Sequence, residues 1–254
     1  QADPPEVLDL DAAATASTRE RLRTLDFEQM STAEMAVAKR MLATLRLPVK
    51  PLTSRRSQTA PQGRIDRRAT LRATLRRGDL TMLKRTKPTT RWPNLVALCD
   101  ISGSMSSYSR ALLHFLHAVA NREGQGWAEV HGFTFGTRLT NITRHLRTRD
   151  VDAALAAAGA ETQDWEGGTR IGTCLHAFNR DWSRRVLGQG AVVLLITDGL
   201  ERGDVGQLRA EAERLAKSCK RLIWLNPLLR WDGFSPQAAG IKALLPLVDS
   251  FHSC

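Results

Sequence analysis

The stretch "NLVALCDISGSMSS", residues 94 to 107, joins an apolar run to a polar turn. The run up to Cys99 has the length and composition of a strand that is buried on both faces of a sheet. Directly after it, Asp100, Ser102 and Ser104 stand on alternate residues, and Gly103 gives the backbone the freedom for a sharp turn. This alternation aims one carboxylate and two hydroxyls at a single point.

Outward from this stretch, strand patterns alternate with helix patterns. "SYSRALLHFLHAVAN" (107–121) has apolar residues at helical spacing, "AVVLLITD" (191–198) predicts a second fully buried strand, and "DVGQLRAEAERLAKSC" (204–219) predicts another helix. The segments on the two sides of Gly136 predict a hairpin. The alternation favours an α/β fold, with a doubly wound, mostly parallel sheet covered by helices on both faces.

Two further polar clusters fall where strands or loops lead into helices. "GGTRIG" (167–172) supplies the hydroxyl of Thr169 beside two glycines, and "TDG" (197–199) places Asp198 after the most apolar strand. Ligands of doubly wound sheets bind beyond the carboxyl ends of the strands. We therefore expect Asp100, Ser102, Ser104, Thr169 and Asp198 to meet at one edge of the sheet.

Two carboxylates at a buried edge repel each other unless a cation lies between them. With three hydroxyls and no His or Cys motif nearby, the donor set suits a hard, octahedral ion, which means Mg²⁺ or Mn²⁺. Two carboxylates neutralise a divalent ion, and hydroxyls add no charge. The ion then stays electrophilic, and an acidic side chain of a partner can fill an open position.

The net charge of +11 is concentrated in one segment of the 254 residues. Residues 51–91 hold twelve lysines and arginines against two aspartates, a formal net charge of +10. The Pro, Ser and Thr content of residues 48–63 predicts a linker. "IDRRATLRATLRRGD" (65–79) predicts a basic helix that ends at Gly78 and carries a narrow apolar stripe. The basic patch consists of Arg55, Arg56, Arg67, Arg68, Arg72, Arg76 and Arg77.

The division of the chain follows from these patterns. We expect a small N-terminal helical appendage over residues 1–50, a basic arm with an amphipathic helix over 51–91, and an α/β domain over 92–254. No apolar run reaches the length that crosses a bilayer, and the first residues have no signal-peptide pattern. Four scattered cysteines outside any CxxC motif fit reduced thiols, so we expect a cytoplasmic protein.

The motifs "DISGSM", "GGTRIG" and "TDG" resemble the metal-ion-dependent adhesion site (MIDAS) of von Willebrand factor type A (VWA) domains. That resemblance implies a Rossmann-like sheet with one antiparallel edge strand, and it makes Asp100, Ser102, Ser104, Thr169 and Asp198 the metal ligands. "DWEGGTRIG", "FNRDW" and "TDGLERGD" resemble the bacterial CoxE-like branch.

The CoxE-like resemblance implies a function as well as a fold. Proteins of that branch accompany MoxR-type AAA+ ATPases in the remodelling or maturation of a client such as a molybdenum hydroxylase, for example carbon monoxide dehydrogenase. We accordingly expect a non-enzymatic, metal-dependent adaptor, a chaperone for a client that presents an acidic side chain. The expected partner contacts beside the site are Trp165, Glu166, Arg170 and Glu201.

Two alternatives stay open. The arginine-rich segment can bind nucleic acid through phosphate contacts, although no aromatic residue is interleaved with its arginines between residues 55 and 91. It can instead dock on an acidic surface of the ATPase, or fold back on the α/β domain. A Mg²⁺-dependent hydrolase is the other alternative, and it needs a general base that the sequence does not identify.

Overall fold

The structure is a computed structural model of the chain. It describes residues 50–78, 82–121, 126–148, 169–188, 190–230 and 237–253. The predicted appendage over residues 1–50 lies outside the described residues except for Lys50, and Trp165 and Glu166 lie outside them too.

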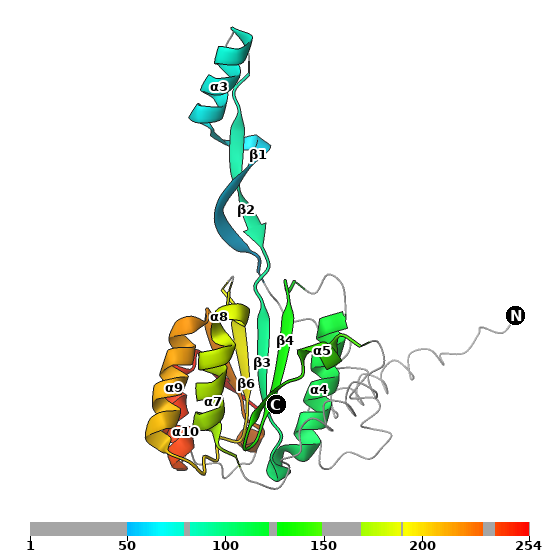
Figure 1. The fold of residues 1–254 in the computed structure, drawn as a ribbon, viewed down its shortest axis with the longest axis vertical. Coiled ribbons are helices and arrows are strands. Elements are labelled where there is room, and N and C mark those ends of the chain that lie inside the picture. Colours follow the sequence, from blue (N-terminus) through cyan, green and yellow to red (C-terminus); the bar gives the residue numbers. More distant parts are fainter. Residues whose placement is uncertain are drawn as a thin grey trace, which may run out of the picture.

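A six-stranded sheet forms the centre of the described chain (Figure 1). Its strands are β3 (Leu95–Asp100), β4 (Val130–Phe135), β5 (Leu139–Asn141), β6 (Val192–Ile196), β7 (Arg221–Leu225) and β8 (Ser250–His252). The order across the sheet is β5-β4-β3-β6-β7-β8, and all neighbours are parallel except β4 and β5. The mostly parallel α/β fold is therefore confirmed, and its antiparallel edge strand is one half of the hairpin predicted around Gly136.

Helices cover both faces of this sheet (Figure 1). One face carries α4 (Ser106–Asn121) and α5 (Thr143–Leu146). The other face carries α7 (Ile171–Asp181), α8 (Ser183–Val186), α9 (Val205–Ser218) and α10 (Ala239–Leu244). Short 3-10 turns are η1 (Gly103–Met105), η2 (Pro227–Arg230) and η3 (Leu245–Leu247). No helix in the described part of the chain has the length and apolar character needed to cross a membrane.

The apolar pattern of the sequence explains this two-sided burial. Every residue of β3 is buried, and successive side chains enter opposite cores, Leu95 beside α4 and Val96 beside α7 and α9. The helices contribute the faces that their spacing predicts, with buried Leu112, Phe115, Leu116 and Val119 on α4 and buried Leu208, Ala212 and Leu215 on α9. The site that follows β3 therefore rests on a rigid, fully covered strand.

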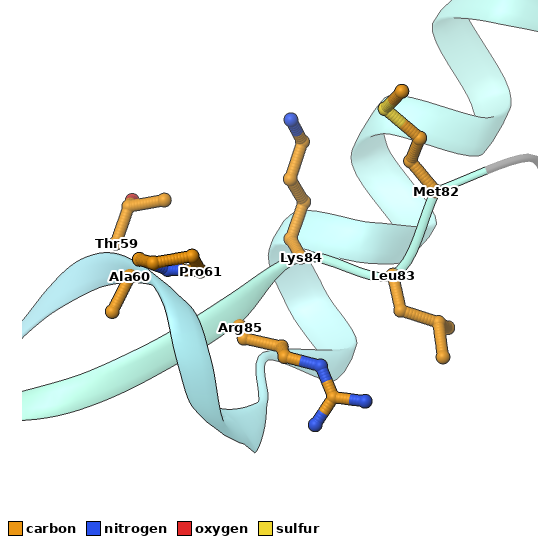
Figure 2. A pocket seen from close by; sticks show the side chains of 7 residues that line it. All are labelled: Thr59, Ala60, Pro61, Met82, Leu83, Lys84 and Arg85. Atoms are coloured by element: carbon orange, nitrogen blue, oxygen red, sulfur yellow. The ribbon is translucent and has the colours of Figure 1, made fainter.

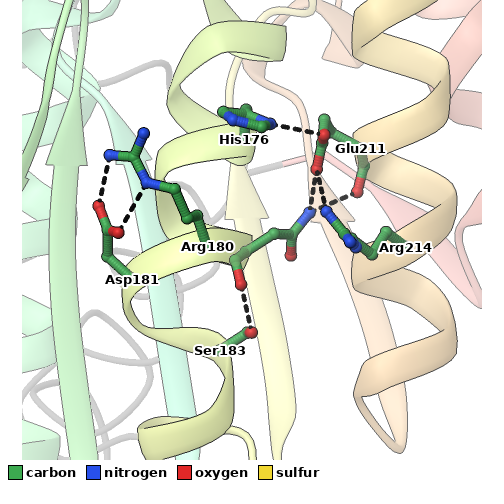
Figure 3. A network of polar contacts seen from close by, with 7 residues as sticks. His176, Arg180, Asp181, Ser183, Glu211 and Arg214 are labelled. Carbon is green, nitrogen blue, oxygen red and sulfur yellow. Dashed lines mark hydrogen bonds and ion pairs between the residues drawn. The ribbon is translucent and has the colours of Figure 1, made fainter.

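The helices α7 and α9 are held together by close packing and by a polar network (Figure 3). A Cβ added at Gly172 would lie 2.8 Å from the backbone nitrogen of Leu208, so the two helices approach closely only because that position has no side chain. Farther along, the carboxylate of Glu211 accepts from the side-chain amide of Asn179 at 2.8 Å and lies 2.8 Å from His176 Nδ1. Both contacts fix α7, whose first turn follows a candidate site loop, against α9.

A basic arm extends from the sheet and consists of β1 (Leu52–Ile65), α3 (Arg67–Arg77) and β2 (Arg85–Arg91) (Figure 1). β1 pairs antiparallel with β2 and forms a two-stranded ribbon, with α3 at its far end. β2 leads directly into the start of β3, so the arm leaves the sheet at the amino ends of its parallel strands. The alternative in which the segment folds back on the α/β domain is therefore wrong.

The linker predicted over residues 48–63 is also wrong, because most of it is strand β1. The strand lacks apolar alternation, and backbone pairing with β2 stabilises it, which side-chain periodicity cannot reveal. Register shifts after Thr53 and after Thr59 absorb the greater length of β1. Gly63 has a φ of 135°, and a Cβ there would lie 2.3 Å from the carbonyl oxygen of Thr86, so only glycine fits at the second irregularity.

The helix predicted in the arm is present as α3. The carboxylate of Asp66 accepts from the amide of Ala69 at 2.9 Å and caps its start, and Gly78, with a φ of 75°, ends it. The hydroxyl of Thr70 accepts from the amide of Lys84 at 3.0 Å, which ties the helix to the segment that enters β2. The predicted apolar stripe of Ile65, Leu71 and Leu75 faces solvent.

Candidate metal centre

Asp100, the last residue of β3, is the centre of the candidate site. Its side chain is fully buried, and each carboxylate oxygen has a hydrogen-bond donor. The amide of Ser102 donates to Oδ1 at 2.9 Å, and the hydroxyl of Thr197 donates to Oδ2 at 2.7 Å. The hydroxyl of Thr169 lies 3.4 Å from Oδ1, so Thr169 lies beside the end of β3.

Asp198 follows the neighbouring strand β6 and is also buried. Its Oδ1 accepts from the amide of Leu200 at 2.9 Å, and its backbone carbonyl accepts from the side-chain amide of Asn226 at 3.1 Å. These bonds hold the turn after β6 against the end of β7. The chain passes from β3 to β4 on one side and later to β6 on the other, so Asp100 and Asp198 flank the point where doubly wound sheets bind ligands.

The loop that carries Thr169 is bonded to both of its neighbours. The amide of Arg202 donates to the carbonyl of Thr169 at 3.1 Å, and the amide of Arg170 donates to the carbonyl of Gly136 at 3.0 Å. The side chain of Thr169 is buried beside Asp100. Residues far apart in the sequence therefore meet at one edge of the sheet.

The two predicted serines lie in the turn that leaves β3. Ser102 is buried, and its carbonyl accepts from the amide of Met105 at 2.8 Å, which closes the 3-10 turn η1. Ser104 lies within η1. The sharp turn predicted from Gly103 is thus present, and the role of Ser104 as a ligand stays a prediction.

The two carboxylates of the site repel each other. Burial raises the pKa of Asp100 to about 6, and the charge of Asp198 adds to the rise, while the hydrogen bonds from Ser102 and Thr197 oppose it. A carboxylate that is poised this way is stabilised in its charged form by a nearby cation.

The donor chemistry of the site fits a hard divalent ion. Its predicted donors are all oxygens, and within the described residues no group of three or more His, Cys, Asp or Glu side chains forms a separate metal cluster. The thiol of Cys174 on α7, which the charge of Asp100 affects, has a pKa raised to about 12 by burial and by the charges of Asp100 and Glu201. It stays protonated at neutral pH, so Mg²⁺ or Mn²⁺ suits the site better than a thiol-seeking ion.

The predicted partner contacts that are described lie beside this site. Arg170 is exposed at the start of α7, whereas Glu201 is half-buried. The carboxylate of Glu201 accepts from the amides of Gly172 at 2.8 Å and Gly203 at 2.5 Å. Glu201 therefore fixes the first turn of α7, a structural role that the sequence did not predict. The basic patch lies elsewhere, on β1 and α3 of the arm.

Thr197 is the site residue that the sequence interpretation missed. Besides donating to Asp100, its hydroxyl accepts from the amide of Gly199 at 3.1 Å, and its carbonyl accepts from the indole nitrogen of Trp224 at 2.9 Å. A signal for it exists in the sequence, because a hydroxyl directly precedes Asp198 at the end of a fully apolar strand. Asn226, which holds the carbonyl of Asp198, has no comparable signal.

The sheet topology and the polar loops at the ends of β3 and β6 define a VWA-type α/β domain. The family model described as "VWA domain containing CoxE-like protein" matches residues 36–254, most of the chain. The protein therefore belongs to the family of CoxE-like proteins that contain a VWA domain. No curated protein gives a significant match.

Solved structures with a similar fold include three distant ones. A von Willebrand factor type A protein from Catenulispora acidiphila is 15% identical, with a TM-score of 0.45, and the match covers 66% of this chain and 40% of that one. An aerotolerance-related membrane protein from Bacteroides fragilis is 16% identical, with a TM-score of 0.42, covering 63% and 90%. Proximal thread matrix protein 1 from the mussel byssus, with a zinc-occupied MIDAS motif, is 14% identical, with a TM-score of 0.40, covering 64% and 44%.

Proposed function

We propose that the protein is a non-enzymatic adaptor that holds Mg²⁺ or Mn²⁺ at the carboxyl ends of β3 and β6 and binds an acidic side chain of a partner through that ion. The observation that carries the proposal is the environment of Asp100. This buried carboxylate has a raised pKa beside Asp198 and is bordered by the hydroxyl of Thr169.

Two of the proposed ligands supply negative charge, and the other three supply neutral oxygen donors. Asp100 and Asp198 supply two negative charges, which balance a divalent ion. Ser102, Ser104 and Thr169 supply neutral oxygens, directly or through water. When bound, the ion offers an electrophilic position that a carboxylate from outside can occupy. Hydrogen bonds from backbone amides support the three loops: the amide of Ser102 donates to Asp100, that of Leu200 to Asp198, and that of Arg202 to the carbonyl of Thr169.

Membership of the CoxE-like family supports the finer proposal about partners. We propose that a MoxR-type AAA+ ATPase works with this chain, and that the metal site recruits a client for remodelling or maturation in the cytoplasm. A molybdenum hydroxylase such as carbon monoxide dehydrogenase is the proposed kind of client.

The first test measures metal binding directly. Mn²⁺ is titrated into the purified full chain by electron paramagnetic resonance, in wild type, Asp100→Ala and Asp181→Ala. We expect Asp100→Ala to keep the fold, checked by circular dichroism, and to lose saturable binding because it removes a charged donor. Asp181 is an exposed aspartate that pairs with Arg180 on the outer side of α7, so its removal is the matched control and leaves binding unchanged. Equal affinity of Asp100→Ala and wild type would refute the site.

The second test concerns the adaptor function. The tagged chain is purified from its native host with and without a chelator, and the same is done with Asp100→Ala. We expect a client to co-purify with wild type in the presence of Mg²⁺ and to be lost on chelation or with Asp100→Ala. A client retained in all three preparations would exclude metal-mediated recruitment even if the ion binds.

A further inference from the structure

The helix α3 buries its small side chains and exposes its large ones. Thr70 is only 6% exposed, and it lies with half-buried Ala73 on the face toward the ribbon. Leu71 and Leu75, one helical turn apart on the outer face, are 61% and 76% exposed. A surface helix normally shows the opposite arrangement, with leucines toward its own protein. The outer face of α3 therefore has the composition of a contact surface.

Arginines frame this leucine pair. Arg67, Arg68, Arg72 and Arg76 are all exposed and share the outer face of α3 with Leu71 and Leu75. Because residues three or four apart are neighbours on a helix, each leucine has an arginine directly beside it. The apolar contact is thus enclosed by positive charge, within a segment whose formal net charge is +10.

A second exposed apolar surface lies where the chain returns from α3 to the ribbon. A hollow of about 380 Å³ opens there. It is lined by Thr59, Ala60, Pro61, Met82, Leu83, Lys84 and Arg85. Met82 and Leu83 are 62% and 51% exposed, and Figure 2 shows both side chains projecting from the segment that leads into β2, beside α3. The tip of the arm therefore carries large apolar side chains on the return segment as well as on the helix.

The arm has almost no core of its own to explain these exposed side chains. Among its described residues, only Ala60 and Thr70 are buried. A two-stranded ribbon of this kind is marginally stable in isolation, so a surface that covers its apolar residues would add substantially to its stability. Its placement keeps it clear of the metal site, because the arm leaves the opposite end of β3 from Asp100.

We propose that the outer face of α3 is a docking helix for a second protein, which presents an apolar groove with an acidic rim. Leu71 and Leu75 enter the groove as anchors spaced by one turn, and Arg68, Arg72 and Arg76 meet carboxylates on its rim. This contact is separate from the metal site, so the chain can bind one protein at the tip of the arm and another at the carboxyl ends of β3 and β6. The inference goes beyond the proposed function and does not depend on the ion.

The composition of the surface favours a protein over nucleic acid as its occupant. Arginines alone are sufficient to bind the phosphates of nucleic acid. The two leucines at the centre of the contact would not find an apolar surface to pack against on a phosphate backbone, so their burial would contribute nothing to binding. No Phe, Trp or Tyr lies between residues 55 and 91 to stack on bases. A second copy of this chain is disfavoured because it would bring two strongly basic arms together.

The test combines site-specific cross-linking with reconstitution. The photoreactive residue p-benzoylphenylalanine is placed at position 71 of the full chain in the native host, and in a parallel variant at exposed Arg209 on α9 as the control. After illumination, the partner is the protein that is cross-linked at position 71 and not at position 209. Mass spectrometry then locates the cross-linked peptide. That protein is then purified, and its affinity is measured for wild type, Leu71→Ser/Leu75→Ser, Arg72→Glu/Arg76→Glu and Asp100→Ala.

We expect the joined peptide to border Asp or Glu residues, and the leucine double variant to weaken binding about 100-fold. The arginine double variant is expected to weaken binding strongly at low salt, and Asp100→Ala is expected to bind as wild type. A separate titration with a fluorescent 20-base-pair DNA duplex tests nucleic acid. The proposal is overturned if no cross-link forms, or if position 71 is joined to a second copy of the chain or to nucleic acid. It is also overturned if both arm variants bind the partner with the affinity of wild type, or if DNA binding depends on the leucines.

Discussion

Asp100 is the residue whose environment makes least sense for stability alone. A carboxylate at a fully buried strand end loses hydration, and the neighbouring Asp198 adds repulsion. The donors on Ser102 and Thr197 offset only part of that cost, which is why the pKa of Asp100 stays raised. A buried charge kept at such a cost is typical of a binding site, where the ligand supplies the missing compensation.

The raised pKa gives a prediction for the metal-free protein. The folded-state pKa of about 6 exceeds 3.8, the ordinary pKa of an aspartate, so the native state holds the proton more tightly than the unfolded chain. The contribution of Asp100 to stability is therefore present below about pH 4 and is lost as the pH rises through 6. In EDTA at pH 7.5, we expect Asp100→Asn to be more stable than wild type by up to about 3 kcal/mol.

Urea unfolding at pH 4.5 and pH 7.5 measures this difference. The advantage of the asparagine variant should shrink at pH 4.5, where the wild-type carboxyl is largely protonated, and excess Mg²⁺ at pH 7.5 should stabilise wild type alone. An asparagine variant that is less stable than wild type at pH 7.5 in EDTA would show that the carboxylate is not strained by its surroundings.

Much of the candidate site could be predicted from single residues, because their positions at the ends of apolar runs indicate where they lie in the sheet. Asp100 and Asp198 each follow a long apolar run, and parallel neighbours end at the same edge, so proximity follows once the strands are assigned. Thr197 could not be predicted with the same ease, because its role depends on how the turn after β6 directs its hydroxyl toward Asp100. The hydrogen bonds that Glu201 accepts from Gly172 and Gly203 depend on how a loop folds back, which the positions of the strand ends do not determine.

At the scale of elements, the prediction was correct for helices and strands with a periodic apolar pattern. It failed for the strand that is determined by backbone pairing. The helices α4 and α9 and the strands β3 and β6 have apolar patterns that match their burial. The strand β1, "LTSRRSQTAPQGRI", has hardly any apolar residue, and its Pro61 and Gly63 lie within the second register shift, between Thr59 and Arg64. Such a ribbon is defined by its partner β2, which lies beyond an intervening helix, so local composition suggested a linker.

The polar network between α7 and α9 gives a prediction at this scale. Burial raises the pKa of Glu211, but the hydrogen bonds with His176 and Asn179 and the charges of His176 and Arg214 together outweigh it, and the pKa is lowered. This stabilisation is present above the usual pKa of a glutamate and is lost as the pH falls through the lowered value. We expect Glu211→Gln to destabilise the protein by about 1 kcal/mol at pH 7, since a neutral amide replaces the charged acceptor.

Urea unfolding of Glu211→Gln and wild type at pH 7 checks this expectation. Glu213→Gln is the matched control, because Glu213 lies on the same helix in an exposed pair with Lys217, and its midpoint should match that of wild type. Equal midpoints for all three proteins would mean that apolar packing around Gly172 and Leu208 alone holds the two helices together.

At the scale of the whole molecule, the candidate site exists only in the folded chain. Its residues come from positions near 100, 169 and 198, which the sheet brings together. An ion that binds this arrangement binds the native state and not the unfolded chain. At 100 times its dissociation constant, Mg²⁺ should therefore raise the free energy of unfolding by about 2.7 kcal/mol.

Thermal unfolding in Mg²⁺ and in EDTA measures this effect. Asp198→Ala should show the same midpoint in both buffers, and Asp181→Ala should respond to Mg²⁺ as wild type does. If the response of Asp198→Ala to Mg²⁺ equals that of wild type, the stabilisation comes from some other place on the protein.

The direct connection between the arm and β3 also has a mechanical consequence. Only residues 92–94 separate β2 from β3, and β3 lies between β4 and β6, with Asp100 at its far end. A force that pulls on the arm therefore acts along the length of the central strand. Such a force loads the backbone hydrogen bonds between β3 and both of its neighbours at the same time. They would then have to break together and not one after another. The arm is thus suited to serve as a tether through which tension reaches Asp100 without first unravelling the sheet.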